Sequence, residues 1–148
     1  MSKHSYTRCW LHMIWGTLNR EKLLPHDARI QVSKYLLDYT QKKQIYMKIN
    51  FVNADHVHAL IDLPTHLSLE EVFQLFKGSS SVWINRNNLI PGKFSWGRGY
   101  SGFSVSHSNV SKVVKYIADQ EEHHRKKTFT EEFDLLVRKH QLNASKKD

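Results

Sequence analysis

The chain has 148 residues, enough for one hydrophobic core and too few for two independent domains. Hydrophobic residues make up 40% and charged residues 24%, which is typical of globular proteins and excludes a disordered or collagen-like chain. The 22 Lys and Arg exceed the 14 Asp and Glu by eight. This positive charge makes nucleic acid the first partner to consider, although a solubilising surface charge would look the same.

The N-terminal region offers only a short apolar run, from Cys9 to Trp15. It is far below the roughly 20 residues that a membrane span needs, and small residues typical of a signal peptide do not follow it. Cys9 is the single cysteine, so no internal disulfide can form. These features favour a cytoplasmic protein with no membrane partner.

Hydrophobic periodicity predicts strands and helices in one continuous series, with no repeat and no linker. In chain order these are a strand (6–17), a turn (19–26), a helix (27–43), two strands (45–53 and 56–63), a helix (68–87), a loop (88–102), a strand (103–106), a helix beginning at Ser108 or Asn109, and a short helix (130–140). Ser68 and Glu71 have the spacing of a capping box at the start of the second helix.

The order βαββαβ followed by helices predicts an α+β, ferredoxin-like, RRM-like fold, in which an antiparallel sheet carries its helices on one face. The whole chain, 1–148, is expected to form one domain, with a polar tail at about 143–148. Alternation along strand 56–63 places His56 and His58 on one side and Val57 and Ala59 on the other. We therefore expect the histidines to point toward the uncovered face of the sheet.

Two residues apart on a strand, His56 and His58 project from the same face about 7 Å apart at the backbone, close enough to share one metal ion. Two ordinary surface histidines would show the same spacing. On the third helix, Tyr116 and Gln120 are neighbours at the edge of the apolar stripe. Alternatively, Tyr116 is a tyrosine at the edge of the core, with its ring buried and its hydroxyl exposed to water.

The segment 85–103 alternates basic and aromatic side chains and contains several glycines. Cations follow a phosphate backbone while aromatic rings stack on bases, so this loop is a candidate DNA contact. The alternative is an ordinary loop that folds its aromatic rings onto the core.

Taken together, three segments resemble the single-tyrosine HUH transposases of small bacterial insertion sequences. They are Ala54-Asp-His-Val-His-Ala-Leu-Ile61, Phe103-Ser-Val-Ser106 and Tyr116-Ile-Ala-Asp-Gln-Glu-Glu-His-His124. Segments 12–20 and 77–85 are also similar to that family, and the order of the motifs agrees with it.

The resemblance implies a metal-dependent enzyme that cuts and rejoins single-stranded DNA at the hairpin-bearing ends of a mobile element. Tyr116 would be the nucleophile and would form a 5′-phosphotyrosine, while His56, His58 and Gln120 would hold Mg²⁺ or Mn²⁺. It also implies a homodimer in which the tyrosine helix of one subunit serves the histidine pair of the other. The residues expected to contact DNA are Lys77, Ser79, Arg86, Lys93, Trp96, Arg98 and Lys112.

Other functions fit part of the pattern. A non-catalytic module could bind single-stranded RNA or DNA on the open face of such a sheet. A metal-dependent hydrolase could use activated water, with Tyr116 only structural. A domesticated relative could bind and cleave repeat sequences without mobilising an element. A covalent protein–DNA adduct on a denaturing gel separates the transferase from the binding module and the hydrolase.

Overall fold

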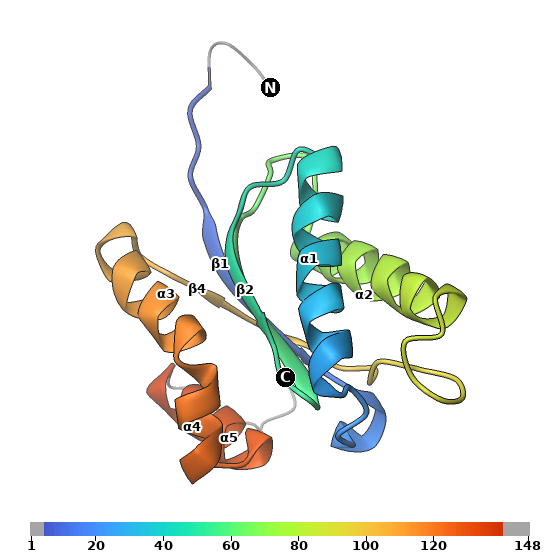
Figure 1. Ribbon diagram of the computed structural model, residues 1–148. Helices are drawn as coiled ribbons and strands as arrows, with labels where there is room; N and C mark the ends of the chain where they lie inside the picture. Colours follow the sequence, from blue (N-terminus) through green and yellow to red (C-terminus); the bar gives the residue numbers. More distant parts are fainter. Residues whose placement is uncertain (1–4, 141–148) are drawn as a thin grey trace.

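The computed structural model describes residues 5–140 and contains a four-stranded antiparallel sheet with strand order β2-β3-β1-β4 (Figure 1). The strands are β1 (Trp10–Gly16), β2 (Met47–Val52), β3 (His56–Asp62) and β4 (Ser101–Ser104). The helices are α1 (His26–Lys42), α2 (Leu69–Arg86), α3 (Val110–Ala118), α4 (Gln120–Lys126) and α5 (Phe129–Lys139), with short 3-10 turns η1 (Leu18–Arg20) and η2 (His107–Asn109). The expected α+β, ferredoxin-like class is confirmed.

Several predicted boundaries shift. The first strand begins at Trp10 instead of residue 6, and the fourth lies at Ser101–Ser104 instead of 103–106. The helix that carries Tyr116 ends at Ala118, and Gln120 begins a separate helix, α4. The capping box of α2 is present, because the Ser68 hydroxyl accepts a hydrogen bond from the Glu71 amide at 3.0 Å and the Glu71 carboxylate accepts one from the Ser68 amide at 2.8 Å. The predicted polar tail at 143–148 lies outside the described residues.

The main core lies between one face of the sheet and helices α1 and α2. Met13 and Trp15 of β1 and Val57 and Ala59 of β3 are buried there against apolar side chains from both helices. Val57 and Ala59 are the side chains that the period-two pattern assigned to the covered face, so alternation along β3 correctly placed them in this core.

The expectation that the other face stays open is wrong. Helices α3, α4 and α5 cover it, so helices lie on both sides of the sheet (Figure 1). The physical reason is that this face also carries large apolar side chains, Trp10, Ile14 and Leu60, which pack against the C-terminal helices. Consequently His56 and His58 are fully buried instead of facing solvent.

The loop between α2 and β4 folds back onto the core. The Asn85 side chain closes it, because its amide nitrogen donates to the Phe94 carbonyl at 3.0 Å and its oxygen accepts from the Phe94 amide at 2.8 Å. Phe94 and Trp96 are buried, and the Trp96 indole donates a hydrogen bond to Ser80 Oγ at 2.8 Å. None of the helices between residues 5 and 140 is long and apolar enough to cross a membrane.

Candidate active site

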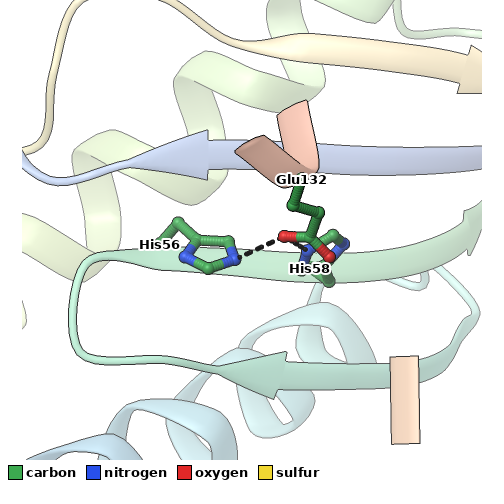
Figure 2. A group of neighbouring side chains, drawn as sticks. All are labelled: His56, His58 and Glu132. Atoms are coloured by element: carbon green, nitrogen blue, oxygen red, sulfur yellow. Dashed lines mark hydrogen bonds and ion pairs between the residues drawn. The ribbon is translucent and has the colours of Figure 1, made fainter. Parts of the chain in front are cut away.

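The histidine pair lies in the middle of the sheet, on the face covered by the C-terminal helices. On β3, His56 is opposite Gly16 of β1, and His58 is opposite Ile14. The two Nε2 atoms converge on one carboxylate oxygen, Oε1 of Glu132, at 3.1 Å from His56 and 3.2 Å from His58 (Figure 2). The predicted pairing of the two imidazoles is therefore present, with a third, acidic partner.

The Nδ1 atom of each of these two imidazoles, on the far side of the ring from Nε2, also contacts a side chain. His56 Nδ1 lies 2.7 Å from Asp55 Oδ1, and His58 Nδ1 lies 2.8 Å from Nε2 of His12. These contacts fix both rings so that Nε2 faces the cluster, which is the arrangement usual for metal-binding histidines.

The environments of the imidazoles move their pKa values in opposite directions. Burial lowers the pKa of His58 to about 4, and burial together with the nearby His58 holds the pKa of His12 well below its usual value. Burial also acts to lower the pKa of His56, but its hydrogen bonds to Asp55 and Glu132 outweigh that effect and raise it. His58 is thus neutral near pH 7 and available as a ligand.

Glu132 contacts both histidines of this cluster, and the sequence interpretation did not identify it. It lies on α5, is only 4% exposed, and places Oε1 3.1 Å from His124 Nε2 as well as near both strand histidines. Burial acts to raise the pKa of its carboxyl, yet hydrogen bonds from His124, His56 and His58 hold it far below its ordinary value. One signal was available, because residue 132 falls between Phe129 and Leu136 within the apolar stripe of that helix.

Tyr116 and Gln120 meet at the other oxygen of Glu132. The Tyr116 hydroxyl donates a short hydrogen bond to Oε2, and Gln120 Nε2 donates to the same atom at 3.0 Å. Gln120 Oε1 accepts a hydrogen bond from Asn53 Nδ2 at 3.1 Å. Burial, followed by the contact with Glu132, raises the pKa of the Tyr116 phenol well above its usual value. The predicted nucleophile, which is partly buried, and the predicted ligands, which are buried, therefore lie in one cluster around Glu132.

The donor set fits a divalent cation. Within residues 5–140, His56, His58 and Glu132 form a group whose ligand atoms all lie within 4.8 Å of one another. Imidazole nitrogens accept several divalent metals, and a carboxylate is the hard oxygen ligand that Mg²⁺ and Mn²⁺ prefer. The third member of this group is Glu132, whereas the sequence interpretation named Gln120.

A cavity of about 470 Å³ opens beside the cluster, between β4, α3 and α5. Tyr116 and Glu132 are among its lining residues, and Lys112 and Lys139 add positive charge. The side chains of Val113 and Leu136 make part of its wall apolar. Such a lining suits a group that combines an anion with a flat apolar ring, as a nucleotide does.

The other expected DNA contacts lie away from this cavity. Arg86, Lys93 and Arg98 are exposed, and Lys77 donates hydrogen bonds to the backbone oxygens of Arg98 and Gly99 at 3.1 and 3.2 Å. Lys77, Ser79 and Arg86 belong to α2, in the helical layer on the opposite side of the sheet (Figure 1).

Trp96 is 8% exposed and packs edge to face against Trp15 and Phe94. Its ring offers no free face to a base. The structure therefore gives Trp96 a packing role, which corrects the expected stacking contact, and matches the alternative in which the loop folds its aromatic rings onto the core.

The chain is similar to known transposases over most of its length. Residues 5–120 match the family described as "Transposase IS200 like". The IS200 transposases of Salmonella typhimurium strain LT2 and of Salmonella typhi are each 25% identical over 122 residues, covering 79% of this chain and 80% of theirs.

Two solved structures share the fold. A candidate transposase from Deinococcus radiodurans superimposes with a TM-score of 0.63 at 20% identity, covering 81% of this chain and 96% of that one. A REP-associated tyrosine transposase bound to a REP hairpin superimposes with a TM-score of 0.60 at 13% identity, covering 84% and 74%. With the family match spanning residues 5–120, the chain belongs to the IS200-like transposase family.

Proposed function

We propose that this transposase cleaves and rejoins single-stranded DNA at hairpin-bearing element ends, with Tyr116 as the nucleophile and with His56, His58 and Gln120 as ligands of Mg²⁺ or Mn²⁺. One observation carries the proposal. The Tyr116 hydroxyl and the Nε2 atoms of both histidines contact the same buried carboxylate, that of Glu132. A tyrosine with only a structural role would not need its hydroxyl in this cluster.

The residue types suit the reaction. A phosphodiester repels an attacking anion, and a bound divalent ion supplies neutralising charge for a non-bridging oxygen. The Tyr116 hydroxyl gives up its proton as its oxygen forms a bond to phosphorus. The bond from phosphorus to the 3′ oxygen breaks, and the released 3′ oxygen takes up one proton, so the step has no net proton change. The resulting 5′-phosphotyrosine conserves the bond energy, so a 3′ hydroxyl can reverse the step and rejoin DNA.

Charge and shape support DNA as the partner. The chain carries a formal net charge of +8, and Lys93, Arg98 and Lys112 are exposed. Lys112 also lines the cavity beside Tyr116. The structural relative bound to a REP hairpin supports a hairpin-bearing strand as the ligand here.

A homodimer that exchanges tyrosine helices stays a prediction. In the structure, the Tyr116 ring lies beside the histidine pair of its own chain, 5.7 Å from His58 between ring centroids. Exchange of α3 without α5 would break the contact from Tyr116 to Glu132 of the same chain. Cross-complementation between Tyr116→Phe and His58→Ala proteins tests this, since only an exchanged site regains activity on mixing.

Trapping of the covalent adduct tests the function. Labelled single-stranded DNA with a hairpin and flanks is incubated with the protein and Mn²⁺ and then run on a denaturing gel. We expect a band of the covalent protein–DNA adduct, and we expect that both EDTA and the Tyr116→Phe substitution abolish it. Cleaved DNA without an adduct would support the water-activating hydrolase, and binding without cleavage would support the non-catalytic module.

A further inference from the structure

We propose that Glu132 has two roles in the active site: its Oε1 is an anionic ligand of the metal ion, and its Oε2 positions the Tyr116 hydroxyl. This inference deepens the proposed function and rests on it. Glu132 lies on α5, beyond residues 5–120 that match the family, so the family match assigns it no role.

The separations between the ligand atoms suit one ion. Two ligands at the Mg²⁺–oxygen distance of about 2.1 Å and at right angles to each other lie about 3 Å apart. Oε1 of Glu132 lies 3.1 Å from His56 Nε2 and 3.2 Å from His58 Nε2. An ion held by both imidazoles would therefore find this oxygen already at ligand spacing.

Charge gives the second argument. Two imidazoles and the Gln120 amide are neutral ligands, and Mg²⁺ and Mn²⁺ bind weakly to such a set without a carboxylate. Glu132 is the only acidic residue that joins both imidazoles in this group among residues 5–140.

The second oxygen connects the ligand set to the nucleophile. Oε2 accepts hydrogen bonds from the Tyr116 hydroxyl and from Gln120 Nε2. The same carboxylate thus fixes where the phenol oxygen lies relative to the imidazoles. This makes Glu132 a positioning residue for Tyr116 as well as a ligand.

Helix α5 is built to hold Glu132 in place. The Phe129 ring stacks on His56 with centroids 4.0 Å apart and planes at 1°. Gly16 makes room for it, since a Cβ there would lie 2.9 Å from Phe129 Cε2. Arg20 Nη1 donates to Thr130 Oγ1 at 2.8 Å. These contacts dock the first turn of α5, and Glu132 follows within that helix.

Calorimetric titration with Mn²⁺ alone, without DNA, tests the ligand role. Glu132→Gln keeps the size of the side chain and removes its charge, and it is expected to weaken Mn²⁺ binding about tenfold or more. Asp134→Asn is the matched control, because Asp134 is an exposed acid on the same helix, and it is expected to bind as wild type does. Wild-type affinity in Glu132→Gln would overturn the ligand role.

The His56→Ala/His58→Ala double variant separates this inference from the proposed function. If the double variant loses Mn²⁺ and Glu132→Gln does not, only the role of Glu132 fails. If the double variant keeps Mn²⁺, the proposed metal site itself fails. Circular dichroism checks folding, and if Glu132→Gln unfolds, Glu132→Asp replaces it. That variant keeps the charge but withdraws both oxygens, so unchanged Mn²⁺ affinity would again refute the ligand role.

The positioning role has its own readout. At saturating Mn²⁺, Glu132→Gln is expected to lower kcat for adduct formation at least tenfold while the KM for DNA changes less than twofold. Tyr116→Phe is expected to keep wild-type Mn²⁺ affinity, because the phenol is not a ligand. An unchanged kcat in Glu132→Gln at saturating metal would refute the positioning role.

Discussion

Replacing Trp96 by Ala distinguishes a ring that packs in the core from one that stacks on DNA. The indole is 8% exposed, donates to Ser80 Oγ at 2.8 Å, and lies 5.9 Å from Trp15 and 4.7 Å from Phe94 between ring centroids. Truncating a buried tryptophan costs about 3 to 5 kcal/mol of unfolding free energy. With a slope of about 2 kcal/mol per molar urea, the midpoint falls by about 2 M.

Urea unfolding followed by circular dichroism measures the loss, and fluorescence anisotropy on labelled single-stranded DNA measures binding over a salt series. We expect the folded Trp96→Ala protein to keep the salt dependence of the wild type. Arg98→Ala is the matched comparison. Because the Arg98 side chain is exposed, its removal should leave the urea midpoint unchanged, and it should flatten the slope of log binding constant against log salt concentration by about 0.7. A Trp96→Ala protein of wild-type stability that binds DNA more weakly would refute the packing role.

Three further outcomes are expected. Tyr116→Phe should abolish the adduct and keep DNA affinity within twofold. Because the variant loses one hydrogen bond to a carboxylate, its free energy of unfolding, measured in a thermal melt, should fall by about 1.5 to 3 kcal/mol. Gln120→Asn should weaken Mn²⁺ binding in calorimetry, because the shorter amide no longer reaches the cluster; equal affinity would remove Gln120 from the ligand set. In EDTA, unfolding free energy should fall by on the order of 3 kcal/mol between pH 6.5 and about 4. Between these pH values His58 becomes protonated in the unfolded chain but stays neutral in the folded protein, where its pKa is about 4. An unfolding free energy that does not change with pH in this range would contradict a buried neutral His58.

The sequence pattern predicted many of the strands and helices, because their formation depends on residues that are close in the chain. Side chains alternate along a strand, so the pairing of His56 and His58 on one face followed from their spacing alone. Helical periodicity predicted α1, the capping box predicted the start of α2, and the order of the elements predicted the ferredoxin-like sheet. The placement of Tyr116 beside Gln120 also followed from residues close in the chain.

Tertiary packing decided which residues meet across long separations. Ile14 and Leu60 make the second face of the sheet apolar, and burying them brings α5 over the histidines. Glu132 therefore reaches His58 across 74 positions in the chain, a contact that no local spacing encodes. Trp96 is buried for the same reason, because covering a large ring with other apolar groups is worth more than leaving it in a polar loop. Periodicity indicates which face of an element is apolar, but only the assembled fold determines which element covers that face.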